Sequence, residues 1–80
     1  MPVPITMPDV GTDRATLSLW FVGPGERVFA GDRVVEVLIP GATVDVAAPV
    51  SGRLLDRIAV VGDSLKPGQT LGHLEHDPDD

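Results

Sequence analysis

A repeated pattern constrains the fold of this chain more than any other feature. Residues 25–31 and 62–68 share the order Gly-acidic-x-aliphatic-x-x-Gly, and the second copy begins 37 positions after the first. The same shift superposes apolar residues, namely Leu17 on Leu54, Phe21 on Ile58, Val34 on Leu71 and Val37 on Leu74. The repeat predicts two similar halves of about four strands each. Since neither half can bury its apolar face alone, we expect them to close into a flattened sandwich with a quasi-two-fold axis.

Short β-branched runs separated by glycine and proline predict the strands. We expect strands over residues 5–8, 15–22, 34–39, 43–47, 53–61 and 70–75. In the second of these, apolar and polar residues alternate, which is typical of a half-buried strand. The alternation predicts that one set of side chains faces the core (Leu17, Leu19 and Phe21) and that the other faces outward (Thr16, Ser18 and Trp20).

The centre of the chain predicts a β-hairpin with its tip at Pro40-Gly41. Proline presets φ at the first central position of a turn, and glycine accepts the positive φ that a type II turn needs at the second. We expect four valines of the hairpin to point inward: Val35, Val37, Val44 and Val46. Residues 48–52 then carry the chain to the second sheet. Because the quasi-two-fold axis relates this tip to the region of the termini, tip and termini are expected at opposite ends.

Composition excludes several classes of function. Twelve acidic residues against six basic ones, with Lys66 as the single lysine, argue against a nucleic-acid surface. The absence of cysteine excludes disulfides and thiolate sites. No apolar run approaches the ~20 residues of a membrane span, and the N-terminus lacks the features of a signal peptide. The default expectation is a cytoplasmic protein.

The C-terminal histidines and aspartates are candidate metal ligands. His73, His76, Asp77, Asp79 and Asp80 supply suitable atoms. In a strand, however, residues three apart point to opposite faces. We therefore predict no metal site, and assign residues 1–76 to the domain and 77–80 to an acidic tail or the start of a linker.

Catalytic and phosphate-binding patterns are weak. Ser18, Ser51 and Ser64 could be imagined with the histidines as a hydrolytic arrangement, but no nucleophile-elbow pattern surrounds them. The glycines of residues 23–25 enclose a proline and precede no helix, so they predict a turn and not a phosphate cradle. No enzymatic activity is expected.

Several motifs in order resemble the lipoyl domain of the biotinyl/lipoyl attachment family. They are residues 7–11 (Met-Pro-Asp-Val-Gly), Trp20 before the first Gly-acidic turn, both repeated turn segments, and residues 42–52. The resemblance covers residues 5–75. It implies an all-β fold, a barrel-sandwich hybrid of two four-stranded antiparallel sheets.

The resemblance also defines where a cofactor would attach. The family carries lipoate on a lysine at the hairpin tip, usually within Glu-Thr-Asp-Lys-Ala, and those positions fall on Leu38, Ile39, Pro40, Gly41 and Ala42. Glycine thus stands at the lysine position, and the Met-Lys-Met of biotinyl domains is absent as well. Lys66 lies where the family has no attachment site. The resemblance therefore implies that no lipoate is bound.

These observations favour a non-catalytic lipoyl-like domain that acts as a structural or protein-interaction module. Leu38 and Ile39 place apolar side chains where the family has polar ones, so they either contact a partner or protect the sheet edge. The alternative is a swinging-arm carrier domain of a 2-oxo acid dehydrogenase acyltransferase component with an altered attachment site. A membrane-fusion adaptor is a third possibility, but such proteins typically insert a helical hairpin at the tip.

Overall fold

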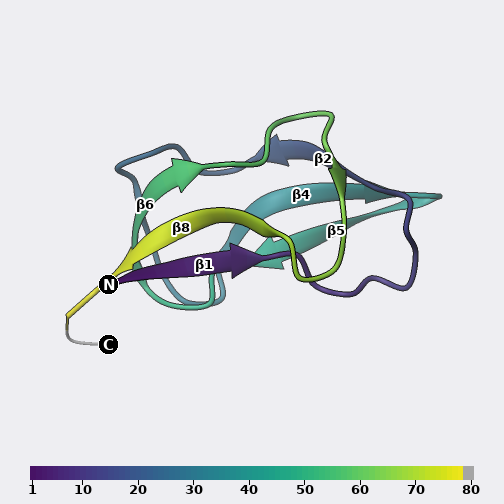
Figure 1. The fold of residues 1–80 in the computed structure, drawn as a ribbon. Helices are drawn as coiled ribbons and strands as arrows, with labels where there is room; N and C mark the ends of the chain where they lie inside the picture. The colour runs from purple at the N-terminus through teal and green to yellow at the C-terminus, as the bar shows by residue number, and fades with distance from the viewer. Residues whose placement is uncertain (79–80) are drawn as a thin grey trace.

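The computed structural model describes residues 1–78, which form two four-stranded antiparallel sheets (Figure 1). The strands are β1 (Pro2–Thr6), β2 (Ala15–Trp20), β3 (Arg27–Val28), β4 (Arg33–Ile39), β5 (Ala42–Ala47), β6 (Gly52–Arg57), β7 (Ser64–Leu65) and β8 (Thr70–His76). The predicted all-β architecture of two packed sheets is confirmed.

The two halves of the chain are interlocked. One sheet has the order β1-β8-β6-β3 and the other β5-β4-β2-β7, so each contains two strands from either half. Every pairing between neighbouring strands is antiparallel. Because each half contributes two strands to both sheets, neither half forms a complete sheet of its own, and the core can close only when both halves are present.

The repeat places equivalent apolar residues in the core. Leu17 and Leu54 are each 1% exposed, and the pairs Val34–Leu71 and Val37–Leu74 are fully buried. Among the described residues, no polar or charged side chain is buried. The core is therefore apolar throughout.

The repeated turn segments share their hydrogen bonds as well. Asp32 accepts a bond from the Phe29 N–H through Oδ2 at 2.9 Å, and Gln69 accepts one from the Lys66 N–H through Oε1 at 3.0 Å. In each turn, a side-chain oxygen therefore satisfies a backbone donor three residues earlier. The 37-position repeat in the sequence thus corresponds to a repeated backbone conformation.

A bulge in β2 makes the predicted orientation of Leu19 wrong. Leu17 pairs with Val37 but Leu19 pairs with Glu36, so Ser18 is an extra residue in the strand. The Ser18 hydroxyl donates to Glu36 Oε2 at 2.9 Å. Leu19 consequently turns toward solvent and is 37% exposed.

The bulge also moves the two aromatic residues that follow it. Trp20 is half-buried against the core, and its indole N–H donates to the Ala59 carbonyl at 2.9 Å, so its predicted outward orientation is wrong. Phe21 lies beyond the end of β2 and is only half-buried, contrary to prediction. The Arg33 guanidinium carbon lies 4.4 Å from the centre of its ring.

The start of β1, the end of β6 and the burial of one hairpin valine differ from those expected. β1 includes Pro2 and Pro4, which an edge strand tolerates because their missing N–H groups cost it no pairing. β6 ends at Arg57, so residues 58–61 lie outside the sheet. In the hairpin, Val35, Val37 and Val46 are buried as predicted, whereas Val44, which lies nearer the tip, is half-buried.

Candidate functional site

The β4–β5 hairpin ends in a turn of only two residues. Ile39 pairs with Ala42, which leaves Pro40 and Gly41 as the connection. Gly41 has a φ of 78°, the conformation required of the second central residue in a type II turn. A Cβ built on Gly41 would meet nothing within 4 Å, so space around the turn is open. The predicted tip is confirmed.

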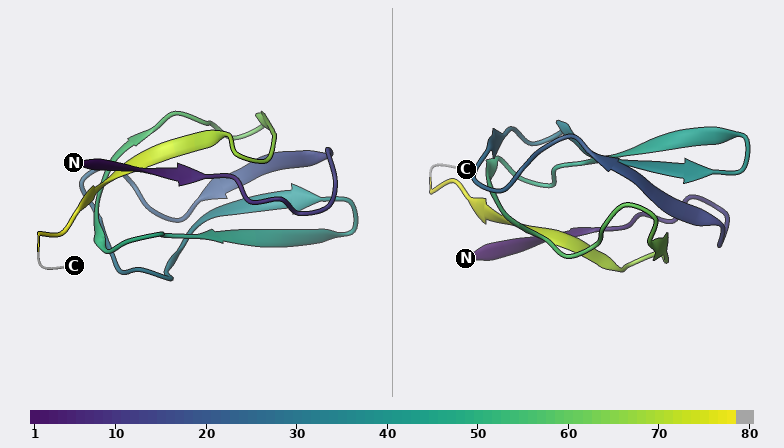
Figure 2. Two further views of the ribbon diagram at one scale, coloured as in Figure 1. Left: turned by 60° about the horizontal axis from the view of Figure 1, so that its bottom comes forward. Right: turned by 90° about the horizontal axis from the view of Figure 1, so that it is seen from above.

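This tip lies at one end of an elongated molecule. The Cα positions extend 38 × 19 × 17 Å, and the hairpin and the two termini occupy opposite ends, as predicted (Figure 2). At the other end, the Met1 amino group lies 3.5 Å from Glu75 Oε1. A ligand or partner could therefore approach the tip without contact with the chain ends.

The two apolar residues before the turn behave differently. Leu38 is 50% exposed, whereas Ile39 is half-buried and packs against the core. Only Leu38 therefore offers a large apolar surface at the tip. Ile39 instead contacts the core of the domain.

The single lysine lies on the opposite edge of the same sheet. Lys66 directly follows β7, and in the order β5-β4-β2-β7 this strand is the farthest from β5. Its side chain is exposed, and its N–H is used in the turn that Gln69 closes. Lys66 therefore belongs to a turn separate from the hairpin tip.

Among the described candidate metal ligands, His73 and Asp77 have different partners. His73 Nδ1 lies 3.0 Å from Asp56 Oδ1 on the neighbouring strand β6. Asp77 forms an ion pair with Arg27, and its N–H donates to the Ser51 carbonyl at 2.9 Å. Asp79 and Asp80 lie outside the described residues. Within residues 1–78, no group of three potential metal ligands is found.

The three serines occupy unrelated places. Ser18 lies in the β2 bulge and bonds to Glu36. Ser51 Oγ accepts a bond from the Ala30 N–H at 2.9 Å, and Ser64 is exposed at the start of β7. Ser18 and Ser51 thus each make a hydrogen bond that shapes the backbone or its strand pairing.

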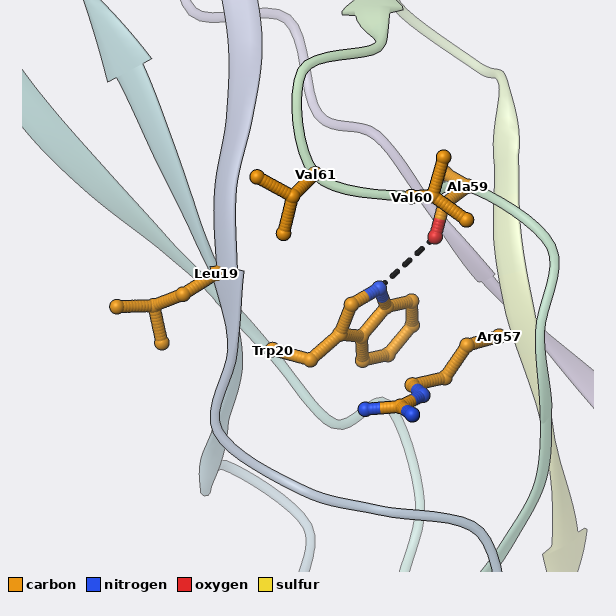
Figure 3. Close-up of a pocket in the computed structure, with 6 residues that line it drawn as sticks. All are labelled: Leu19, Trp20, Arg57, Ala59, Val60 and Val61. Carbon is orange, nitrogen blue, oxygen red and sulfur yellow. Dashed lines mark hydrogen bonds between the residues drawn. The ribbon is translucent and has the colours of Figure 1, made fainter.

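A half-open groove lies between β2 and the segment that follows β6 (Figure 3). Its volume is about 410 Å³, and its lining consists of Leu19, Trp20, Arg57, Ala59, Val60 and Val61. The sequence did not predict this groove, because residues 58–61 were expected in a strand and Leu19 in the core. The available signal was the 37-position shift, which places Leu19 on the polar Asp56.

Comparison with a solved structure defines the class of this fold. The lipoyl domain of the 2-oxoglutarate dehydrogenase complex from Azotobacter vinelandii superposes with a TM-score of 0.67 at 22% identity. The match covers 90% of this chain and 96% of that domain. The molecule has the lipoyl-domain fold.

Sequence comparison then gives the family. The family model described as "Biotin-requiring enzyme", the biotin/lipoyl attachment model, matches residues 3–74. The chain belongs to the biotin/lipoyl attachment family and is a lipoyl-type domain, which is itself non-catalytic.

Curated relatives are acyltransferase components. This chain is 35% identical, over 94% of its length, to a protein from Bartonella vinsonii. That protein is the dihydrolipoyllysine-residue succinyltransferase component of the 2-oxoglutarate dehydrogenase complex. Over 89% of this chain, the lipoamide acyltransferase component of the branched-chain alpha-keto acid dehydrogenase complex from Pseudomonas putida is 34% identical. The chain spans 19% and 17% of these relatives' lengths. In the part that the structure describes, no helix is long and apolar enough to cross a membrane.

Proposed function

We propose that this domain is not lipoylated and acts as a structural or protein-interaction module, within the cytoplasm. The observation that carries the proposal is the tip itself. Residues 38–42 read Leu-Ile-Pro-Gly-Ala, and Gly41 stands at the centre of the turn where the resemblance places the acceptor lysine.

Chemistry supports this proposal because lipoylation forms an amide with a side-chain amine. Gly41 has no side chain, and Pro40 lacks even a backbone N–H. The type II turn adds a second obstacle, since L-residues rarely adopt the φ of 78° found at Gly41. A change at this position alone would therefore create a strained attachment point.

The relatives suggest the setting in which the module works. The curated relatives are components of the 2-oxoglutarate and branched-chain alpha-keto acid dehydrogenase complexes. We infer that this domain serves an acyl-transfer assembly of that kind by contacting another protein. The exposed Leu38, together with Ile39 beside it, is the proposed contact at the tip.

A second candidate is a lipoyl carrier domain whose attachment site has been altered. The retained fold and the 35% identity to an acyltransferase component favour it. On this alternative, the body of the domain still fits the lipoate ligase, and only the tip prevents acylation. The two candidates differ in what happens when the tip is restored.

Intact mass after co-expression with an active lipoate ligase tests the proposal. The unaltered protein should gain no lipoyl group. The combined variant Leu38→Glu, Ile39→Thr, Pro40→Asp and Gly41→Lys restores the family tip, and a gain of one lipoyl group in it would favour the carrier ancestry. The single variant Gly41→Lys is the matched control for turn strain.

A mass gain in the unaltered protein would overturn the proposal, and its loss in Lys66→Arg would identify Lys66 as the acceptor.

The contact at the tip needs its own test, the double change Leu38→Ser and Ile39→Thr. Unchanged oligomeric state together with unchanged capture of a dehydrogenase-complex component would refute that contact.

A further inference from the structure

The groove between β2 and residues 57–61 is a preformed feature of the fold. The β2 bulge turns Leu19 outward and brings Trp20 against the loop. The bond from the Trp20 indole N–H to the Ala59 carbonyl then joins β2 to the loop across the base of the groove (Figure 3). Because this donor is already satisfied, the ring offers its apolar surface to a ligand.

The rim of the groove is apolar and exposed. Val60 is 55% exposed, Val61 is 67% exposed and Leu19 is 37% exposed. With the neighbouring Ile58, at 56%, they form a group of aliphatic side chains that the core leaves uncovered. Clusters of this kind on a small domain mark contact sites more often than single exposed residues do.

The architecture does not require these side chains. The quasi-two-fold axis relates Val60 and Val61 to Gly23 and Pro24, which build the same turn in the first half. It also relates Leu19 to Asp56. One half of the molecule thus makes the turn without an aliphatic rim, so turn formation does not explain the rim.

A single charge lies in this apolar setting. Arg57 is the one charged residue that lines the groove, which it shares with Trp20 (Figure 3). Arg27 and Arg33 pair with Asp77 and Asp45, whereas no ion pair or hydrogen bond of the Arg57 side chain is found within residues 1–78. The chain as a whole carries a net charge of −6, so this local cation stands against the overall charge.

We propose that the groove binds an extended peptide segment of a partner protein, with an aliphatic side chain next to a carboxylate. The aliphatic group would pack between Leu19, Val60 and Val61, and the carboxylate would pair with Arg57. A volume of about 410 Å³ is at the size of ligand clefts, and a half-open shape suits a chain that passes through.

The surface is separate from the hairpin tip. Trp20 pairs with Val35 and Leu19 with Glu36, whereas Leu38 near the tip pairs with Thr16 at the other end of β2. Peptide binding is therefore expected whether or not the tip is acylated. Failure of this proposal and failure of the proposed function are distinguishable, because the mass measurement does not involve the groove.

Fluorescence of Trp20, the single tryptophan, tests the proposal directly. The probe is the acetylated and amidated hexapeptide Gly-Val-Leu-Glu-Val-Gly. We expect a saturable change in emission. A matched peptide with glutamine in place of glutamate should bind about tenfold more weakly, because it loses the charge-assisted contact.

Variants locate the site. Arg57→Gln should weaken the glutamate peptide about tenfold and leave the glutamine peptide unaffected. Val61→Asp should abolish binding. Pro24→Asp introduces aspartate at the equivalent position of the other half and should not affect binding. Circular dichroism confirms folding of each variant, and Val61→Ser replaces Val61→Asp if that variant unfolds.

Three results would overturn the proposal. They are no emission change at millimolar peptide, equal affinity for the two peptides, or equal loss in Pro24→Asp and Val61→Asp. Octanoate serves as a non-peptide probe with a carboxylate and an apolar chain. If it binds as tightly as the glutamate peptide, the groove recognises small carboxylates and the proposed peptide partner is wrong.

Discussion

The turn segments 23–32 and 60–69 have one backbone conformation and two different surfaces. Gly25 and Gly62 have φ values of 87° and 92°, and the N–H of each donates to a leucine carbonyl of the other half. The exposed residues that precede these glycines are unalike, Pro24 in one turn and Val61 in the other. The comparison shows which positions serve the fold and which are available for binding.

The equivalent strands β2 and β6 differ at one buried position. The equivalent of Ala15 on β2 is Gly52 on β6, and both are buried. A Cβ on Gly52 would lie 1.9 Å from the Glu75 carbonyl oxygen. The second half therefore packs β6 against β8 more closely than a side chain permits, so the symmetry is approximate even in the core.

The largest expected effect comes from Gly52→Ala. Because the new methyl group would collide with backbone, which cannot rotate away, we expect a loss of more than about 3 kcal/mol in the free energy of unfolding. Urea denaturation measures it. The reverse change at the equivalent position, Ala15→Gly, should cost only about 1 kcal/mol. Similar losses in both would show that the two sites are packed alike.

Two core leucines test how equal the halves are. Leu17→Ala and Leu54→Ala each remove a side chain that is 1% exposed, and each should cost about 3 kcal/mol through lost burial and a residual cavity. Thermal and urea unfolding of the two variants should agree within about 1 kcal/mol. A larger difference would mean that one half collapses around its cavity and the other does not.

Glycines in the two turns should respond equally. Gly31 and Gly68 have φ values of 92° and 82°, and a Cβ on either would meet nothing within 4 Å. Alanine at each should therefore cost about 1–2 kcal/mol, from backbone strain alone. Unfolding midpoints measure the losses. An unchanged midpoint in one variant would show that its turn can relax to a negative φ.

The smallest expected effect separates the two turns by charge. Asp32→Ala and Gln69→Ala each remove an exposed acceptor of a backbone N–H, which should cost about 0.5–1 kcal/mol. The loss should be larger for Asp32, because a carboxylate accepts a stronger bond than an amide does. Urea midpoints at matched salt resolve the difference, and a larger loss for Gln69→Ala would contradict it.

The sequence predicts the parts of this fold that depend on repetition and turn chemistry. The 37-position shift identified three buried pairs, although its fourth pair, Phe21 and Ile58, is not buried, and Pro40-Gly41 located the hairpin tip. Both rest on local rules, namely which residues accept a positive φ and which spacing recurs. The candidate attachment position at Gly41 followed from the same turn chemistry and from the family resemblance.

The groove could not be predicted, because it depends on register. Strict alternation through β2 placed Leu19 inward, and a single extra residue at Ser18 reversed that orientation. The first strand was expected to begin at Ile5, whereas β1 begins at Pro2, because an edge strand accommodates proline. Whether residues 58–61 continue a strand is likewise decided by the partner strand β8, which pairs with β6 only as far as Arg57.

The interlocked sheets make the region of the chain ends equivalent to the hairpin turn. The 37-position shift carries Ile39 onto His76, and β1 pairs with β8 as β5 pairs with β4. The chain ends therefore stand where a second hairpin turn would be. A circular permutant that begins at Gly41, with a short linker between Asp80 and Met1, would preserve every strand pairing while exchanging the order of the halves. The hairpin turn and the region of the termini are thus equivalent positions at which the chain could begin and end.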